Sequence, residues 1–399
     1  MCTYCTQAAV EVNTARDERR NPLKITGLRT FHVEPRWLFV AIDTDNGITG
    51  WGEPIVEGQA RVVERMIEDL SEYLVGQDPR RIEHHWQVMY RGAFYRGGPV
   101  LCSAISGIDQ ALWDITGKHF NAPVHELLGG RVRDNIRMYG HARGETAADF
   151  SAAALRAQAQ GMTAIKFGLD GPVAVIDTPD YVDRQVERVA AVRATVGREF
   201  DIALDFHGRT SPAMAKRLAE KLAPLDPMFI EEPCLPENID ALVDIARSTT
   251  IPIATGERLF TKWGFRDVIE RRAVSIVQPD LSHAGGISET RRIAAMAESH
   301  YISVAPHNPL GPISLAACLQ IDACTPNFLI QEHPSVDDGA DLGHGILRNA
   351  FSIEAGVIKV PQGPGLGIEV DEEQLASRTY PGDWASPRFT HPDGSHGDW

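Results

Sequence analysis

The amino-acid sequence predicts an α/β fold: a modified (β/α)8-type TIM barrel of the form (β/α)7β, preceded by an α+β capping domain. From about residue 135, eight short apolar segments alternate with amphipathic or alanine-rich segments, which is the rhythm of a barrel. Seven successive segments of this series also end beside an ionisable residue. A doubly wound sheet is the alternative, but no glycine-rich dinucleotide-binding turn follows the first apolar segment.

The capping domain is expected at residues 24–132, after a flexible tail at 1–23. β-Branched and aromatic residues dominate its first two segments, and Asn46-Gly47 after the second is a hairpin signal. The last expected helix is apolar on several sides, which predicts that it is well buried. The expected strands cover 25–33, 37–44 and 48–52, and the expected helices cover 60–75, 80–91 and 100–119.

The barrel is expected at residues 133–354, and residues 355–399 are expected to fold back on the cap. This last part is rich in Gly, Pro and polar residues, and Trp399 within it indicates that the tail docks on the protein. The expected barrel strands are 136–139, 164–167, 202–206, 228–231, 253–255, 275–278, 303–305 and 328–331. The expected helices between them are 148–160, 180–196, 211–222, 238–247, 263–270, 287–299 and 313–323.

Composition and charge exclude several classes of protein. The 399 residues include 54 acidic and 39 basic side chains, giving a formal net charge of −15. This balance argues against binding to nucleic acid or to an anionic membrane surface, although a local positive field can still bind an anionic small molecule. No apolar run reaches the roughly 18 residues of a transmembrane helix, and residues 1–22 lack the apolar core of a secretory signal.

The cysteines predict a cytoplasmic, thiol-reduced protein. Six cysteines are too few for a disulfide scaffold in a chain of 399 residues. Cys2 and Cys5 form a C-x-x-C, but no second pair or spaced histidines complete a zinc site. We therefore interpret this motif as part of a solvated tail.

Ionisable side chains stand at the carboxyl ends of the predicted strands. A single polar residue there is usually solvated, but in a barrel all of these ends converge on one opening. Asp205, Glu231 and Glu257 would repel one another unless a cation held them, and three carboxylates suit Mg²⁺ better than zinc. The residues at these ends are Lys166, Asp205 with His207, Glu231 with Glu232, Glu257 with Arg258, Asp280, His307, and Glu332.

These residues and the sequences around them resemble the enolase superfamily, in its mandelate racemase-like subgroup. The resemblance covers residues 24–399, and within the subgroup it is greatest to the galactonate dehydratases, which convert D-galactonate to 2-dehydro-3-deoxy-D-galactonate. The tail from His391 to Trp399 resembles that group and the related mannonate and gluconate dehydratases. The matching stretches are 50–54, 94–99, 109–114, 205–209, 229–233, 278–287 and 305–307.

The resemblance implies a role for each strand-end residue. Asp205, Glu231 and Glu257 would hold one Mg²⁺ per subunit, and Glu232 would support them or pair with a neighbouring lysine. His307 would take the C2 proton of a sugar acid, oriented by Asp280 as in other His–Asp pairs. His207 would protonate the departing 3-hydroxyl; as residue i+2 from Asp205 in a strand, it would face the same side. Glu332 would hydrogen-bond to the substrate carboxylate or be protonated beside it.

Five residues are candidate substrate contacts, and the resemblance further implies a homo-oligomer, with an octamer as the expected form. The candidates are Lys166, Arg258, His141, Tyr95 and Gln59.

Two departures from the subgroup leave the substrate open. The subgroup's K-x-K pair reads Lys166-Phe167-Gly168 here, which argues against a racemase with two bases. His141 follows the first barrel strand where the galactonate dehydratases tend to have an aromatic, so another aldonate stereoisomer, such as gluconate or mannonate, stays an alternative. A racemase or cycloisomerase of the same scaffold is a further alternative. A non-catalytic paralogue is disfavoured because the acid–base set is complete.

Overall fold

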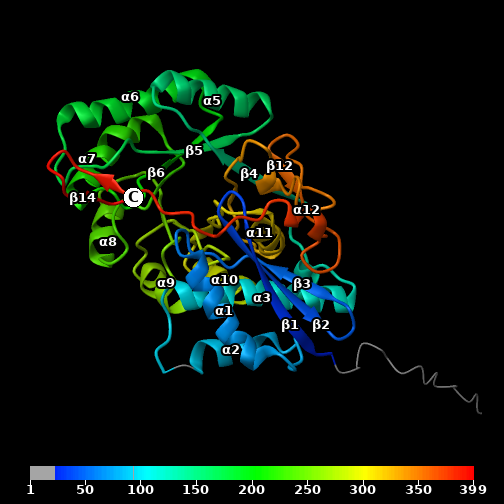
Figure 1. Cartoon of the computed structure of the whole chain (residues 1–399). Helices are drawn as coiled ribbons and strands as arrows, with labels where there is room; N and C mark the ends of the chain where they lie inside the picture. The colour runs from blue at the N-terminus through cyan, green and yellow to red at the C-terminus, as the bar shows by residue number, and fades with distance from the viewer. Residues whose placement is uncertain (1–22, 93) are drawn as a thin grey trace, which may run out of the picture.

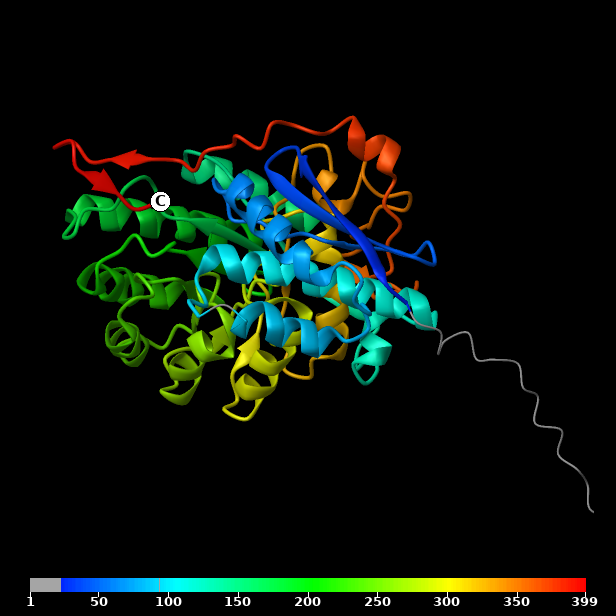
Figure 2. The ribbon, with the colours of Figure 1, turned by 60° about the horizontal axis from the view of Figure 1, so that its bottom comes forward.

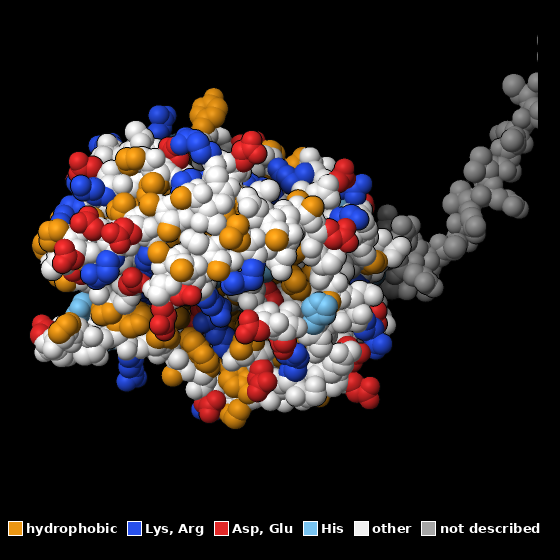
Figure 3. Space-filling model, turned by 90° about the horizontal axis from the view of Figure 1, so that it is seen from above, with side chains coloured by type: hydrophobic (Ala, Val, Ile, Leu, Met, Phe, Trp, Pro, Cys, Tyr) orange, Lys and Arg blue, Asp and Glu red, His pale blue; other side chains and the backbone are white. Residues whose placement is uncertain are grey.

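The computed structural model describes residues 23–92 and 94–399, so the interpretation of Cys2 and Cys5 lies outside the described residues. A sheet and helices from the first third of the chain cover one side of a larger α/β unit (Figure 1). The C-terminal segment crosses from α12 (Glu372–Ala376) to the side of α7 (Pro212–Leu222), and Figure 2 shows it running along the top of the molecule. None of the described helices is long and apolar enough to cross a membrane. Acidic and basic side chains are interspersed on the face that Figure 3 shows, which is hollowed near its middle.

The cap is a three-stranded antiparallel sheet with helices packed against it. Strands β1, β2 and β3 lie side by side in sequence order. Helix α3 is buried along most of its length, as its apolar composition predicts, and packs on β3, α1 and α2. The cap elements are β1 (Ile25–Val33), β2 (Trp37–Thr44), β3 (Thr49–Gly52), α1 (Ala60–Leu74), α2 (Ile82–Arg91), α3 (Pro99–Phe120) and α4 (Val124–Leu127).

The barrel strands are parallel and follow one another in space in their sequence order. The path runs from β4 to β10, and β11 pairs with β4 on the other side. Hydrogen bonds from Val304 N–H to the carbonyl of Asn327 and from Leu329 N–H to the carbonyl of Val304 join the two ends of this path. The strands are β4 (Asn135–His141), β5 (Ala164–Gly168), β6 (Asp201–Asp205), β7 (Phe229–Glu231), β8 (Ile253–Thr255), β9 (Ile276–Val277), β10 (Ser303–Val304) and β11 (Gln331–Glu332).

Helices follow the barrel strands and cover the outside of the sheet (Figure 2). Strand β12 (Val357–Lys359) adds an unpredicted antiparallel neighbour to β4. The barrel domain's boundaries at residues 133 and 354 stay predictions. The helices are α5 (Ala147–Ala159), α6 (Pro179–Val196), α7 (Pro212–Leu222), η2 (Ala223–Leu225), α8 (Ile239–Arg247), α9 (Thr261–Glu270), α10 (Gly286–Glu298), α11 (Pro312–Cys324) and η3 (Ala340–Leu342).

The C-terminal segment runs along the cap before it reaches the barrel. It contains α12 (Glu372–Ala376) and the short hairpin of β13 (Phe389–Thr390) and β14 (His396–Gly397). Tyr380 N–H donates to the carbonyl of His32 at 3.1 Å, and the Arg61 guanidinium donates to the carbonyl of Pro381 at 2.7 Å. These bonds fix the segment against β1 and α1.

Strand β3 and helix α3 meet backbone to backbone. A Cβ on Gly52 would lie 1.9 Å from the carbonyl oxygen of Gly107, and a Cβ on Gly107 would lie 2.4 Å from the ring of Pro54. Real atoms do not approach so closely, so only glycine fits either position. This seam locks the cap sheet onto its central helix.

Glu53 joins the cap to the barrel directly after the seam. Its fully buried carboxylate accepts the backbone N–H of Gly311 at 2.7 Å and that of Ser314 at 2.9 Å, at the start of α11. Its own N–H donates to Gln110 Oε1 at 2.8 Å. The side chain therefore satisfies two helix N–H groups that have no partner within the helix.

Replacing Glu53 by glutamine is expected to lower the free energy of unfolding by about 1–3 kcal/mol, because the new NH2 group faces a backbone N–H that loses its acceptor. Chemical denaturation monitored by circular dichroism measures this. Glu72→Gln on the exposed face of α1 is the matched control, with an expected change within about 0.5 kcal/mol. Equal effects of both substitutions would contradict the role given to Glu53.

Candidate active site

The barrel interior is filled in layers, and the polar layer lies two residues beyond an apolar one. The apolar layer takes one residue from each of the eight strand segments, with Tyr139 and Phe229 as its two aromatic members. Residues i and i+2 of a strand face the same side, so the next inward position along each strand opens toward the cap. The pairs are Tyr139 with His141, Ala164 with Lys166, Ala203 with Asp205, Phe229 with Glu231, Ala305 with His307, and Ile330 with Glu332.

A cavity of about 630 Å³ lies over this polar layer. The cap contributes Arg36, Val56 and Glu57 to its walls, and the C-terminal segment contributes Trp399. Eight of the predicted site residues line it directly, while Glu231 and Asp280 are fully buried behind the wall. The eight are His141, Lys166, Asp205, His207, Glu257, Arg258, His307 and Glu332.

Lys166 is the central cation of the buried charges. Its Nζ lies 2.7 Å from Glu231 Oε2, 2.6 Å from Glu332 Oε1 and 3.8 Å from Asp205 Oδ2. Burial opposes the charge on Lys166, but Glu231 and Glu332 raise its pKa well above the usual value. Burial also opposes the negative charge on Asp205. Lys166 and His207 outweigh this effect and lower the pKa of Asp205. The ammonium therefore compensates part of the negative charge at this end of the barrel.

The remaining carboxylate oxygens fit a divalent cation. Glu231 Oε1 and Glu257 Oε2 are buried and have no hydrogen-bond partner among the described residues. One ligand atom each from Glu231, Glu257 and His307 lies within 4.8 Å of the others. Burial raises the pKa of Glu231 to about 7 and that of Glu257 well above its usual value, so both carboxylates need positive charge to ionise together. Hard oxygen donors that are orphaned and close together suit Mg²⁺.

Asp205 stands at the edge of this group. Its Oδ1 accepts the backbone N–H of His207 at 2.7 Å. Its Oδ2 lies 3.8 Å from the ammonium of Lys166. The group of three that the geometry brings together thus contains His307, whereas the predicted metal-binding group contains Asp205.

His307 and Asp280 form the predicted pair. His307 Nδ1 donates to Asp280 Oδ2 at 2.7 Å, and the second oxygen of Asp280 accepts the N–H of Ser282 at 2.6 Å. This leaves His307 Nε2 facing Glu257 Oε2 at 3.4 Å. Burial lowers the pKa of His307, but Glu257 and Glu332 outweigh it and hold the pKa well above the usual value. The ring is therefore oriented at Nδ1 and turns Nε2 toward the acidic cluster.

His207 reaches the cavity by a different route from the predicted one. Strand β6 ends at Asp205, and His207 has a left-handed backbone with φ of 53°. The expectation that both residues share one strand face is therefore wrong, although both line the cavity. His207 Nε2 lies 3.7 Å from Glu257 Oε1. Burial lowers the pKa of His207, against the pull of Asp205. Strained backbone of this kind is concentrated at functional sites.

Both carboxylate oxygens of Glu332 have hydrogen-bonding partners. Oε1 lies 2.5 Å from His141 Nε2 and 2.6 Å from Lys166, and Oε2 accepts the N–H of Asn308 at 2.9 Å. Burial opposes its charge, but Lys166 and His307 hold the pKa of Glu332 well below the usual range. The structure therefore favours an ionised Glu332 over the protonated form that the sequence left open. His141 belongs to the same hydrogen-bonded group, with a pKa lowered by burial.

Glu232 is buried outside the cavity wall and pairs with an arginine, so of its two expected roles the pairing with a lysine is wrong. Its backbone is left-handed, with φ of 46°. Glu232 Oε1 accepts the hydroxyl of Thr255, and Oε2 accepts the Nε–H of Arg258 at 2.8 Å. Arg258 therefore lines the cavity while this carboxylate holds it in place.

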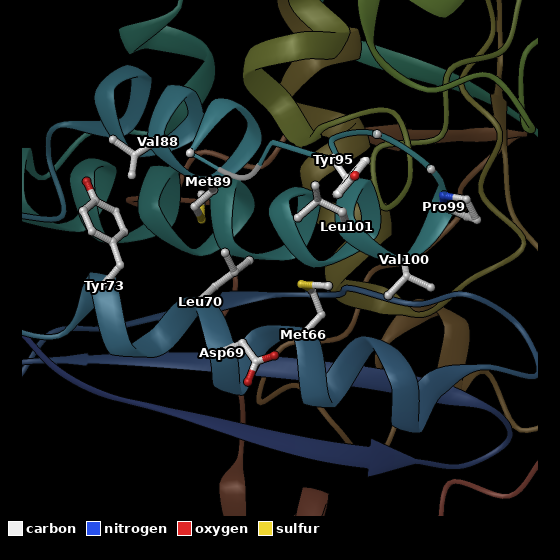
Figure 4. A pocket seen from close by; sticks show the side chains of 13 residues that line it. Met66, Asp69, Leu70, Tyr73, Val88, Met89, Tyr95, Pro99, Val100 and Leu101 are labelled. Atoms are coloured by element: carbon white, nitrogen blue, oxygen red, sulfur yellow. The ribbon is translucent and has the colours of Figure 1, made fainter.

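Tyr95 and Gln59 do not line this cavity. Gln59 is exposed just before α1, and Tyr95 is 89% exposed. Tyr95 borders a second cavity of about 430 Å³ among α1, α2 and α3 (Figure 4). The walls of that cavity are mostly apolar and carry one carboxylate, Asp69. Because these cap loops have no fixed period in the sequence, their distance from the barrel opening could not be predicted.

Several residues that line the cavity were not among the predicted site residues, and His283, Glu57 and Arg36 form a chain of polar contacts there. His283 Nε2 lies 3.7 Å from Asp280 Oδ2 and 3.8 Å from Glu57 Oε2, and its Nδ1 lies 2.9 Å from Ser103 Oγ. Glu57 Oε1 in turn lies 3.5 Å from the guanidinium of Arg36. His283 could have been found as a second ionisable residue three positions after Asp280. Arg36 and Glu57 lie in the cap loops 35–37 and 54–59, which on sequence grounds could close over the substrate, but no local pattern singled out these two side chains.

Comparison with known proteins identifies the family. Residues 9–129 match the model of the mandelate racemase / muconate lactonizing enzyme N-terminal domain, and residues 149–374 match the enolase C-terminal domain-like model. The chain belongs to the enolase superfamily. Members of this superfamily generally bind Mg²⁺, in agreement with the orphaned carboxylate oxygens of the site.

Relatives within the superfamily cover nearly all of the chain. It is 48% identical to a D-galactonate dehydratase of Ralstonia pickettii and 48% identical to another of Variovorax paradoxus, in each case over 94% of this chain and 100% of the relative. A solved enolase-superfamily structure from Salmonella Typhimurium is 31% identical, with a TM-score of 0.84 over 89% of this chain and 98% of that one. A mandelate racemase/muconate lactonizing enzyme from Sulfitobacter is 32% identical, with a TM-score of 0.85 over 90% and 96%. The predicted capping domain and barrel are confirmed by this likeness.

Proposed function

We propose that the protein is a Mg²⁺-dependent sugar-acid dehydratase, a hydro-lyase that converts an aldonate into its 2-dehydro-3-deoxy derivative. D-Galactonate is the first candidate substrate, because relatives that carry the name D-galactonate dehydratase are 47–49% identical over 94% of the chain. A six-carbon sugar acid is also small enough for a cavity of about 630 Å³.

One observation carries the proposal: two imidazoles flank a single carboxylate in the cavity. His307 Nε2 faces one oxygen of Glu257 at 3.4 Å, and His207 Nε2 faces the other at 3.7 Å. The two rings come from different strand ends, so they can act on neighbouring carbons of one substrate. A β-elimination needs a base at one carbon and an acid at the next.

The proposed reaction divides these roles between the histidines. Although burial lowers the pKa of His307, the charge of Glu257 raises it, and a bound Mg²⁺ would balance that charge. The neutral ring of His307 then takes the C2 proton on Nε2, while Asp280 orients the ring through Nδ1. The electron pair left at C2 forms the C2–C3 double bond as the C3–O bond breaks. His207 must carry a proton for this step, against the burial that lowers its pKa, and donates it to the departing hydroxyl, which leaves as water. The enol then tautomerises to the 2-keto product, so atoms and electrons balance.

Asp205, Glu231 and Glu257 would hold one Mg²⁺ per subunit. A bound Mg²⁺ supplies positive charge that stabilises the negative charge developing on the substrate carboxylate. Lys166 and Glu332 would border the carboxylate end of the substrate, with His141 holding Glu332 in place. Arg258 is a weaker candidate for substrate contact because Glu232 already binds its guanidinium.

A racemase or cycloisomerase is the alternative within the superfamily. Gly168 lines the cavity where a second base on that side would stand, so a two-base racemisation lacks its partner there. His207 favours elimination, because a leaving hydroxyl needs a proton donor. A homo-oligomer, with an octamer as the expected form, and a cytoplasmic location are further parts of this proposal.

A screen of aldonic and aldaric acids with Mg²⁺ tests the proposal, with semicarbazide absorbance reporting 2-keto-3-deoxy products. We expect conversion of D-galactonate or a six-carbon epimer, loss of activity after EDTA treatment, and recovery when Mg²⁺ is added back. Failure to convert any six-carbon aldonate would overturn the proposed function. Isomerised acids without water loss would favour the racemase instead.

A further inference from the structure

The segment 384–399, here called the closing segment, ends in the wall of the candidate active site. Trp399 lines the same cavity as His207 and Glu257. The rings of Trp399 and His207 lie 5.6 Å apart between centroids, inclined at 67°. The closing segment thus supplies part of the wall of a site whose chemistry comes from the barrel. Its backbone passes over the barrel beside β6 and α7 in Figure 1.

Contacts with the cap hold the first part of the closing segment. The Arg36 guanidinium lies 5.0 Å from the ring centroid of Trp384, and Ser386 Oγ donates to the carbonyl of Glu57 at 3.2 Å. Arg36 and Glu57 both line the cavity themselves. The ring of Trp384 also lies near that of Trp399, with 6.1 Å between the two centroids.

Contacts with the barrel hold the second part. The Arg209 guanidinium lies 4.9 Å from the ring centroid of Phe389, at the start of the hairpin of β13 and β14. A Cβ on Gly397 would lie 3.0 Å from Pro172, so the hairpin packs tightly against the segment after β5. Contacts with both the cap and the barrel therefore hold the closing segment, and with it Trp399, in position.

The indole is a broad apolar surface in a cavity whose walls combine many ionisable side chains with a few apolar ones, such as Val56 and Phe260. Under the proposed reaction, His207 faces C3, so C4 and the carbons beyond it extend past His207 toward Trp399. Aromatic rings offer a broad apolar face that suits the C–H groups of such a chain and excludes water. On these grounds we infer that Trp399 is a specificity-determining residue, which packs on the distal carbons of the sugar acid. This inference rests on the proposed function for the identity of the substrate.

Trp399→Ala tests the inference with D-gluconate, D-galactonate and D-mannonate and with five- and four-carbon aldonates as probes. We expect KM for the preferred six-carbon acid to rise about tenfold or more while kcat changes much less, because the lost contact lies away from the reacting carbons. Discrimination between six- and four-carbon acids should fall in parallel. Trp399→Phe should retain most of the wild-type preference.

Tyr301→Ala is the matched control, because Tyr301 is 99% exposed just before β10, at the end of the barrel away from the cavity. Unchanged KM and discrimination in Trp399→Ala would overturn the inference. If thermal unfolding shows that Trp399→Ala does not fold, Trp399→Phe and Trp399→Leu are compared instead. If an aromatic ring is required, Trp399→Leu should raise KM and Trp399→Phe should not.

Calorimetric titration of the same acids into the Mg²⁺-loaded protein separates this inference from the proposed function. Binding without turnover by the wild-type chain would refute the dehydratase proposal. Weakened binding in Trp399→Ala would still support the role of the indole in that case. Equal affinities of wild type and Trp399→Ala for every acid that binds would refute the role of Trp399 alone.

Discussion

Replacing His307 by asparagine is expected to lower kcat about 10²–10⁴-fold with little change in KM, because proton abstraction at C2 loses its base. Asparagine keeps a polar side chain of similar length but cannot take a proton near neutral pH. The rate of 2-keto-3-deoxy product formation under saturating Mg²⁺ measures the effect. Exchange of the C2 hydrogen in D2O should fall by the same factor.

A control for this variant is His300→Asn, since His300 lies between α10 and β10 at the opposite end of the barrel. It should leave kcat unchanged. Asp280→Asn should also lower kcat, because Nδ1 of His307 loses the carboxylate that accepts its proton at 2.7 Å. Near-normal kcat in His307→Asn would contradict the assignment of the base.

Replacing His207 by asparagine is expected to separate the two halves of the reaction. The base His307 stays in place, so exchange of the C2 hydrogen with D2O should continue. Loss of the hydroxyl should slow about 10²–10⁴-fold, because the leaving group no longer receives a proton. Proton NMR of the recovered substrate measures exchange, and product absorbance measures elimination.

Two outcomes would contradict this division of roles. Loss of exchange in parallel with elimination would mean that His207 is needed for the C2 proton as well. Unchanged dehydration would mean that another group protonates the hydroxyl. A racemase that relies on His307 would lose little activity in the same variant, so this experiment also separates the two candidate functions.

The barrel could be predicted from the sequence because its strands and helices are local patterns. The predicted segment at 164–167 and the observed β5 differ by one residue, and the other barrel helices and strands were found in their predicted order. The polar layer was equally predictable, since Lys166 and Asp205 stand two residues after the small core residues Ala164 and Ala203. Strand alternation alone puts each such pair on one face.

Turns after the strands could not be predicted, because they depend on the backbone. His207 and Glu232 both adopt left-handed conformations, with φ of 53° and 46°. Glu232 thereby turns toward Arg258 and Thr255, although it directly follows the active-site residue Glu231. Residues with a Cβ adopt this conformation rarely, so periodicity gave no sign of it.

Contacts between distant parts of the chain were the other gap. His283 of the barrel approaches Glu57 of the cap at 3.8 Å, and Trp399 reaches His207 from far along the chain. The sequence indicated that the tail docks, but the surface it meets depends on how cap and barrel pack. The spacing of residues within the cap, the barrel or the tail does not predict how these parts pack together.

The seam between Gly52 and Gly107 matters for anyone who wishes to redesign this protein. Those two positions tolerate no side chain, because the atoms opposite would lie 1.9 Å and 2.4 Å from a new Cβ. Mutagenesis libraries aimed at new substrates should therefore leave the seam invariant. Diversity belongs instead at Arg36, Glu57 and Trp399, which line the cavity.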